Sequence, residues 1–192
     1  AYMAANRKGV DGEVDKSNAK QLIQNAGIDT ADYFSTEPDE HLKESSISIE
    51  FPLFVKPIAG GDSQGIDANS VVNDFASFKA KVADIWNTQN SRSLVETYLS
   101  GREYSVGIFE DYASGTLTAM PIEIIAQMNE NGQRILDFDI KRFDSEQVIS
   151  VNNPMIHKQL STLAKDALRA LNGKAFGRID IKMNHLNTPY VM

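Results

Sequence analysis

Between residues 93 and 143, apolar and polar side chains alternate over four short segments that are separated by turn residues. The segments span residues 93–99, 102–110, 117–125 and 134–143, and Gly101 and Gly132 lie in two of the turns. Alternation with a period of two predicts strands with one buried face, and short turns join neighbouring strands in antiparallel order. The chain is therefore expected to build an antiparallel sheet.

Three helical segments surround this region. The first begins at Asp15 and ends at Gly27, the second spans residues 73–86, and the third follows Asn153 and Pro154. The third has the most regular apolar stripe, formed by Leu160, Leu163, Ala164, Ala167, Leu168 and Leu171. A further strand is predicted at residues 175–183. Helices combined with an antiparallel sheet predict an α+β fold.

Composition excludes several classes of function. A net charge of -7 over 192 residues argues against binding to nucleic acid or an anionic membrane surface. The absence of cysteine excludes a thiolate nucleophile and a cysteine-built zinc site. No apolar run approaches the roughly 20 residues of a membrane span, and no signal peptide is evident at the start, so a cytoplasmic location is expected. The first residue is not Met and the last three form an apolar run, which suggests a fragment.

A lysine and a glycine-rich loop suggest a phosphate site. Lys56 ends an apolar strand-like run and is followed by Gly60, Gly61 and Gly65, whose backbone amides could approach an anion closely. Lys16 lies in the first turn of its helix, where the helix dipole disfavours a cation unless an anion is near. The alternatives are an ordinary surface loop and a solvated lysine.

Two of the predicted strands carry charged residues on one face. These residues are Asp137, Asp139 and Lys141 in the segment 134–143, and Arg178, Asp180 and Lys182 in the segment 175–183. Taken singly, either face fits the solvated side of a half-buried sheet. They gain weight only in combination with the glycine-rich loop and the lysines beside it.

The glycine-rich loop also matches the G-x-S-x-G pattern of serine hydrolases, with Ser63 as the nucleophile. His157 or His185 could then supply the base. Residues 57–60 separate the strand from this loop, however, and the next helix begins only near Asn73, whereas the hydrolase turn joins both elements directly. A hydrolase is therefore the weaker hypothesis.

In chain order, these segments resemble the ATP-grasp ligases, and the D-alanine–D-alanine ligases in particular. The resemblance rests on Asp15-Lys16, on Val55-Lys56-Pro57 with Gly61-Asp62-Ser63-Gln64-Gly65, on Glu96-Thr97-Tyr98-Leu99 with Gly101-Arg102-Glu103, and on Gly177-Arg178-Ile179-Asp180. It covers nearly the whole chain. It implies two α+β subdomains whose antiparallel sheets grip ATP between them: a lead-in at 1–12, a small subdomain at 13–96 and a large one at 97–192. The resemblance does not extend to the substrate domain of the family, which this chain is expected to lack.

The resemblance also implies roles for individual residues. Lys16, Lys56 and the loop residues Gly61, Ser63 and Gly65 would bind the phosphates; Glu96, Thr97, Tyr98 and Leu99 would form the hinge that binds adenine; and Glu103 would bind the ribose. Lys141 would reach the terminal phosphate, Asp180 would bind magnesium or manganese, and Arg178 would stabilise charge at the reacting carbonyl.

The implied reaction joins a small-molecule carboxylate, activated as an acyl phosphate, to an amine, with ATP converted to ADP. Amino acids are the expected substrates, and a homodimer of the parent protein is compatible with the family. Asp62 stands where these ligases usually carry a serine, which puts D-alanine in doubt. The chain stops at Met192, where a Glu-x-Asn metal motif would begin, so this fragment alone is expected to be inactive. A non-catalytic ATP-binding module remains the alternative.

Overall fold

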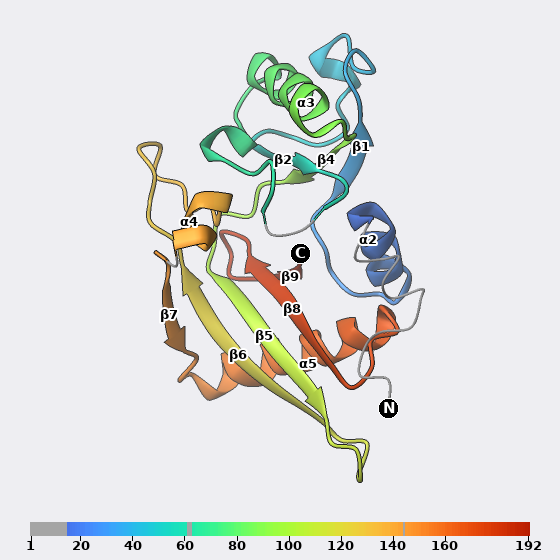
Figure 1. Ribbon diagram of the computed structural model, residues 1–192, viewed down its shortest axis with the longest axis vertical. Helices are drawn as coiled ribbons and strands as arrows, with labels where there is room; N and C mark the ends of the chain where they lie inside the picture. The colour runs from blue at the N-terminus through green and yellow to red at the C-terminus, as the bar shows by residue number, and fades with distance from the viewer. Residues whose placement is uncertain (1–14, 61–62, 144) are drawn as a thin grey trace.

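The computed structural model describes residues 15–60, 63–143 and 145–192, apart from the side chains of Phe138, Asp139 and Lys141. The chain forms two sheets, and Figure 1 shows them at opposite ends of the molecule with the C-terminus between them. The strands of each sheet pair in antiparallel fashion. This arrangement confirms the predicted α+β class.

The smaller sheet has the strand order β1-β4-β2-β3 and is covered by one long helix. Its elements are β1 (Tyr33–Thr36), β2 (Leu53–Pro57), β3 (Val71–Val72), β4 (Ser93–Thr97) and the helix α3 (Phe75–Gln89), with short 3-10 turns η1 (Glu44–Ser46) and η2 (Ala68–Ser70) in the connections. Val55 and Val95 of the sheet pack against Phe78, Val82 and Ile85 of α3 in a fully buried core. The helix begins at Asp74, whose carboxylate accepts the Ser77 N–H.

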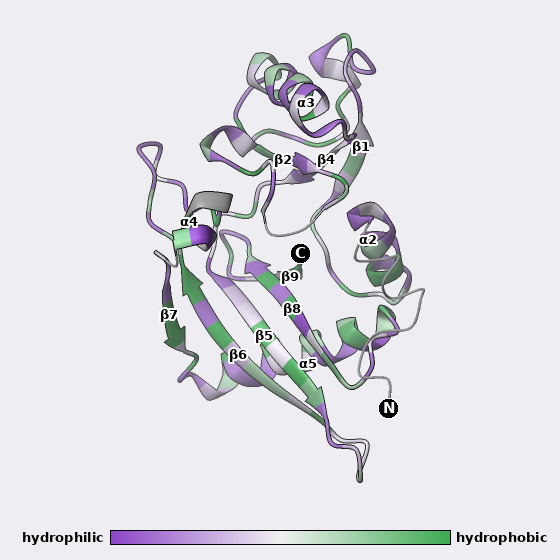
Figure 2. Ribbon diagram, viewed as in Figure 1, coloured by the Kyte–Doolittle hydropathy of each residue, from purple (hydrophilic) through white to green (hydrophobic). Residues whose placement is uncertain are grey.

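The larger sheet has the strand order β7-β6-β5-β8-β9, and α5 crosses one of its faces (Figure 1). Its elements are β5 (Glu103–Glu110), β6 (Leu117–Ile125), β7 (Gln147–Ser150), β8 (Phe176–Met183), β9 (Pro189–Val191) and α5 (Pro154–Ala170). Figure 2 shows hydrophobic and hydrophilic residues interleaved along β6 and β8. Tyr104, Val106 and Ile181 point to the α5 side and are buried there with Leu160 and Ala164. The opposite face is left free to carry polar side chains.

The first helix lies beside both sheets. It is α2 (Lys16–Asn25), which Asp15 caps by accepting the N–H groups of Ser17 and Asn18. Ile23 joins the core under α5, while Lys20 reaches toward the small sheet. The predicted division into residues 13–96 and 97–192 therefore remains a prediction, because α2 contacts elements of both halves.

One predicted strand is wrong. Residues 134–143 do not form a strand: the segment ends in the short helix α4 (Phe138–Phe143). The helix begins there because the Asp137 carboxylate accepts the N–H of Ile140 at 2.8 Å, the contact of an N-cap residue. The strand that pairs with the outer side of β6 is instead β7, which follows this helix in the chain.

No helix within the described ranges is both long enough and apolar enough to cross a membrane.

Candidate functional site

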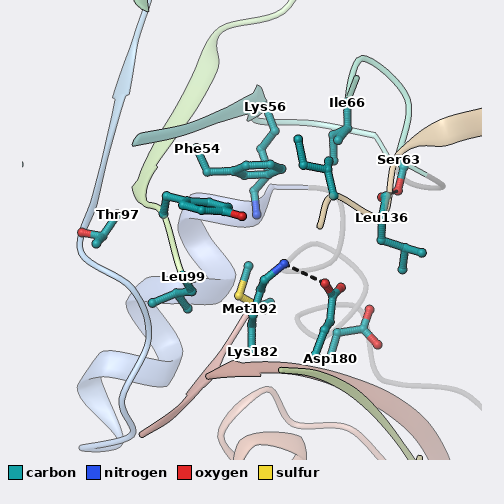
Figure 3. Close-up of a pocket in the computed structure, with 13 residues that line it drawn as sticks. Phe54, Lys56, Ser63, Ile66, Thr97, Leu99, Leu136, Asp180, Lys182 and Met192 are labelled. Carbon is teal, nitrogen blue, oxygen red and sulfur yellow. Dashed lines mark hydrogen bonds and ion pairs between the residues drawn. The ribbon is translucent and has the colours of Figure 1, made fainter. Parts of the chain in front are cut away.

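A cleft of about 130 Å³ lies where the two sheets face each other (Figure 3). Its lining comes from both halves of the chain: Phe54, Lys56, Ser63, Ile66, Thr97, Tyr98, Leu99, Glu103, Ile135, Leu136, Asp180, Lys182 and Met192. Apolar side chains share this lining with four charged ones. A ligand here would therefore need both a flat apolar part and charged groups.

The segment after β4 forms one wall of the cleft. The N–H groups of Thr97 and Tyr98 are already bonded to the carbonyl oxygens of Asp32 (2.9 Å) and Pro52 (3.1 Å). Leu99 is 5% exposed, and within the described ranges its N–H donates to no main-chain carbonyl. A buried N–H without a partner is costly, so the Leu99 amide is a donor available to a ligand.

Glu103 and Lys182 form an ion pair in the lining. The Lys182 ammonium lies 2.8 Å from Glu103 Oε2 and 3.3 Å from the carbonyl oxygen of Arg134. The two residues face each other across β5 and β8, which pair in antiparallel register. The lysine thereby holds the carboxylate at the cleft, where the second oxygen of Glu103, Oε1, can accept hydroxyl hydrogen bonds.

Farther along β8, the predicted alternation is correct. Asp180 accepts a hydrogen bond from the Ser105 hydroxyl at 2.9 Å, and its Oδ1 lies 3.1 Å from Arg178 Nε. Both charged side chains are substantially exposed. Residues 15–60, 63–143 and 145–192 contain no group of three or more acidic or histidine side chains placed to hold a metal ion. Asp180, the predicted metal ligand, is therefore not part of such a group among these residues, and its role stays a prediction.

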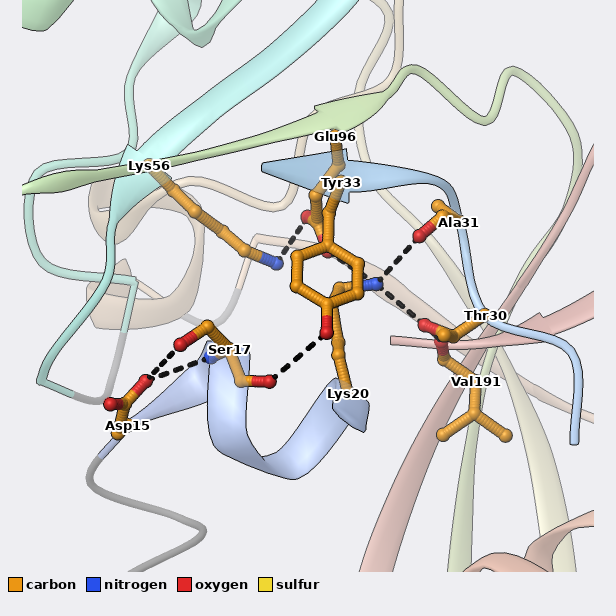
Figure 4. Close-up of polar contacts among 9 residues, drawn as sticks. All are labelled: Asp15, Ser17, Lys20, Thr30, Ala31, Tyr33, Lys56, Glu96 and Val191. Atoms are coloured by element: carbon orange, nitrogen blue, oxygen red, sulfur yellow. Dashed lines mark hydrogen bonds and ion pairs between the residues drawn. The ribbon is translucent and has the colours of Figure 1, made fainter. Parts of the chain in front are cut away.

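Lys56 meets a second lysine at one buried carboxylate, as Figure 4 shows. Glu96 is 1% exposed, with Oε2 2.5 Å from the Lys56 ammonium and Oε1 2.6 Å from that of Lys20. The two lysines hold the pKa of Glu96 below its usual value in spite of burial, which acts to raise it. Glu96 does not line the cleft, although the resemblance implied a contact with adenine; Lys56 does.

Lys16 is placed differently from Lys56. Its ammonium donates to the carbonyl oxygens of Pro57 (2.9 Å) and Gly60 (2.7 Å), at the start of the glycine-rich loop, and it does not line the cleft. Burial, reinforced by the charge of Lys56, lowers the pKa of Lys16 to about 8, although Glu96 and Asp15 oppose this shift. Lys16 thus fixes the base of the loop and holds a proton that it readily releases.

Part of the glycine-rich loop can be described. Gly61 and Asp62 lie outside the described residues, as does the side chain of Lys141, whose backbone is in α4. Ser63 has a positive φ of 57°, and its hydroxyl donates to the Leu136 carbonyl oxygen at 3.0 Å. At Gly65 (φ 74°), a Cβ atom would lie 2.6 Å from Pro57, so a larger residue would displace the loop.

Several lining residues were not predicted from the sequence. Lys182 was placed with Arg178 and Asp180 on one charged strand face, but no individual role was predicted for it. Lys20 lies behind the cleft and carried no sequence signal, because its partner Glu96 is distant in sequence and meets it only in the folded chain. The apolar lining residues Phe54, Ile66, Ile135, Leu136 and Met192 looked like ordinary core residues.

Two antiparallel sheets that enclose a cleft lined by lysines and carboxylates define an ATP-grasp fold. The family model described as "D-ala D-ala ligase C-terminus" matches residues 22–192, and the chain belongs to this family.

The chain is similar to D-alanine–D-alanine ligases over about half of their length. It is 26% identical to that of Bifidobacterium animalis subsp. lactis over 204 residues, which cover 91% of this chain and 53% of the relative. The Bacillus anthracis D-alanine–D-alanine ligase complexed with ATP has a TM-score of 0.74 at 22% identity, over 100% of this chain and 57% of that one. The VanG D-Ala:D-Ser ligase of Enterococcus faecalis has a TM-score of 0.77 at 18% identity, over 98% and 54%. At these identities, the two structures show a shared fold.

Proposed function

We propose that the protein is an ATP-dependent carboxylate–amine ligase that forms an amide or peptide bond through an acyl phosphate, with release of ADP. The observation that carries this proposal is the cleft between the two sheets, which is lined by Lys56, Lys182, Glu103 and Asp180 and by Leu99, whose N–H has no main-chain partner among the described residues. Membership in the ligase family supports the reaction class. The structure of a relative complexed with ATP supports the ligand.

The residues of the cleft fit ATP. Phe54, Ile66 and Met192 offer apolar surface to a base, and the Leu99 N–H can donate to a ring nitrogen. Glu103 can accept the hydroxyl groups of a ribose. Lys56 supplies a point charge for phosphate oxygens.

A magnesium or manganese ion also fits, on a narrower basis. Asp180 is the acidic side chain at the cleft that is not engaged by a lysine, and its carboxylate is partly exposed. Such an ion keeps several waters and shares its ligands with phosphates, so one protein carboxylate in this part of the chain is compatible with it. When bound, the ion would neutralise phosphate charge.

The chain's own residues would act by positioning and by neutralising charge. Lys56 would hold the phosphates, and Lys141 on α4 would serve the terminal phosphate. Arg178 lies beside Asp180 on β8 and would stabilise the negative charge that develops at the reacting carbonyl when the amine attacks the acyl phosphate. Lys16 would support the glycine-rich loop through its bonds to Pro57 and Gly60. The substrates would be amino acids, and the parent protein would form a homodimer.

Replacement of Lys56 tests the site. Calorimetric titration of the full-length protein with ATP and magnesium should show an affinity at least about 30-fold lower for Lys56→Ala, because a charge-assisted phosphate contact is lost. Lys158→Ala, on the exposed surface of α5, is the matched control and should bind as the wild type does. Equal affinities of Lys56→Ala and the wild type would rule out this phosphate site.

Release of ADP in the presence of amino acids separates a ligase from a non-catalytic module, which would bind ATP without turnover. A fluorophosphonate reagent tests the serine hydrolase hypothesis and is expected to leave Ser63 unlabelled. The Ser63 hydroxyl donates to a carbonyl oxygen, and within the described ranges no histidine lines the cleft with it. Labelling of Ser63 would favour the hydrolase.

A further inference from the structure

The buried carboxylate of Glu96 is shared equally by two lysines (Figure 4). Lys56 extends from β2 and contacts Oε2, whereas Lys20 extends from α2 and contacts Oε1, at nearly equal distances of 2.5 and 2.6 Å. All three side chains are less than a tenth exposed. Of the three residues, Lys56 alone lines the cleft.

This cluster carries an excess of positive charge. One carboxylate faces two ammonium groups, so at neutral pH the three side chains sum to +1. A buried charge without a counter-charge is unfavourable. The excess can be neutralised from the cleft, where Lys56 is the member of the cluster that an anionic ligand can reach.

Lys20 is held in place by groups other than Glu96. Its ammonium donates to the Thr30 hydroxyl at 2.5 Å and to the Ala31 carbonyl oxygen at 3.4 Å. The Thr30 hydroxyl in turn donates to the Val191 carbonyl oxygen at 2.7 Å, next to the cleft residue Met192. Lys20 is thus fixed between α2, the start of the small sheet and β9, at a position where it engages one oxygen of Glu96.

We propose that Lys20 is a positioning residue for phosphate binding: by occupying half of the Glu96 carboxylate, it leaves Lys56 with positive charge available to the phosphates of a nucleotide. Without Lys20, Glu96 and Lys56 would form a closed, neutral pair, and the nucleotide would have to compete with Glu96 for the lysine. This inference rests on the proposed function, because it takes the anion in the cleft to be ATP.

The charge balance of the cluster gives a test that a purely structural role would not satisfy. Lys20→Met should weaken ATP binding about tenfold in calorimetric titrations of the full-length protein with magnesium, the equivalent of one favourable charge contact. Adding Glu96→Gln to this variant removes the competing carboxylate and restores the sum of +1. The double variant should therefore recover affinity to within about threefold of the wild type.

Lys20→Gln serves as a second variant in case the methionine protein does not fold. Glutamine keeps a donor for Thr30 but carries no charge, so the same loss and the same recovery with Glu96→Gln are expected. Lys158→Met is the matched control. Thermal melts of each variant report whether the fold is retained.

The possible outcomes separate the two proposals. Failure of the wild type to bind ATP would overturn the proposed function. ATP binding by the wild type with unchanged affinity in folded Lys20→Met or Lys20→Gln would overturn the role of Lys20 alone. Weaker binding that Glu96→Gln does not restore would show that Lys20 acts through the fold and not through the charge of Lys56, and it would also overturn the inference.

Discussion

Lys182 determines how Glu103 is presented to the cleft. Its side chain is 10% exposed, and its ammonium lies 2.8 Å from the Glu103 carboxylate. Lys182→Met would leave this carboxylate free to turn away from a ribose. We expect the preference for ATP over 2′-deoxy-ATP to fall toward unity, a change of about tenfold for one hydrogen bond to a charged group. Competition titrations with the two nucleotides would measure the ratio.

Lys182→Arg is the control for this ratio, since it keeps a cation beside Glu103. A ratio that is the same in the methionine variant and the wild type would mean that Glu103 does not contact the 2′-hydroxyl under the control of Lys182.

We expect nucleotide binding to depend on pH through Lys16. Its pKa is about 8 in the folded chain, so the ammonium that supports the loop is lost as the pH rises through that value. We expect ATP affinity to be constant below about pH 8 and to decrease as the pH rises above that value. Titrations below and above this value would show the decrease in the wild type. In Lys16→Met, the affinity should be low throughout and this transition should be missing.

The same shift has the opposite effect on stability. Because the pKa of Lys16 is lower in the folded chain than its ordinary 10.5, the folded chain binds fewer protons between about 8 and 10.5. The contribution of Lys16 to the free energy of unfolding therefore rises with pH over this window. Chemical denaturation at several pH values would give this contribution as the difference in free energy of unfolding between the wild type and Lys16→Met. A decrease in that difference with rising pH would contradict the assigned shift.

The helix α4 depends on its first contact. It has six residues, and Asp137 accepts the N–H of Ile140 at 2.8 Å. Removing an N-cap side chain costs a helix about 1 kcal/mol. In Asp137→Ala, we expect the backbone amides of residues 138–143 to exchange with solvent faster, as hydrogen-exchange measurements would show. Asp137→Asn retains the cap and should exchange like the wild type; equally fast exchange in both variants would argue against capping.

The same helix shows where sequence patterns fail. Leu136, Phe138 and Ile140 alternate with polar residues as in a strand, and a helix of six residues is too short for its own period to stand out. The strand β1 was missed for the related reason that four residues carry little pattern. The helix α5 was predicted well because it has 17 residues, carries a regular apolar stripe and lies between the turn residues Asn153 and Gly173. A long helix or strand shows its periodicity in the sequence, whereas the conformation of a short segment depends on its tertiary contacts.

The candidate site also contains features that were predictable from local sequence and features that were not. The alternation along β8 correctly placed Arg178 and Asp180 on one face, because neighbouring strand positions are related by local geometry alone. The Lys20–Glu96 pair and the Thr30–Val191 hydrogen bond join residues 76 and 161 positions apart. Neither residue type nor spacing specifies such partners, so the buried network behind the cleft emerged only from the folded chain.

The contact between Ser63 and Leu136 joins the two halves of the molecule across the cleft. Its hydroxyl hydrogen bond, at 3.0 Å, connects the glycine-rich loop of the small sheet to the segment before α4. Ile66, Ile135 and Leu136 line the cleft at the same place. The hydrogen bond therefore connects the two segments that form this wall of the cleft. Ser63→Ala removes the hydrogen bond without adding bulk at a position with positive φ. The fold of each half should be unchanged in this variant.

We therefore expect Ser63→Ala to release nucleotide faster, by about fivefold for the loss of one neutral hydrogen bond. The melting temperature should stay within a few degrees of the wild type, because neither hydrophobic core is touched. Stopped-flow displacement of a fluorescent ATP analogue would measure the release rate. Ser91→Ala, which removes a local hydrogen bond to Arg92 away from the cleft, is the matched control. An unchanged release rate in Ser63→Ala would show that the contact does not hold the nucleotide in place.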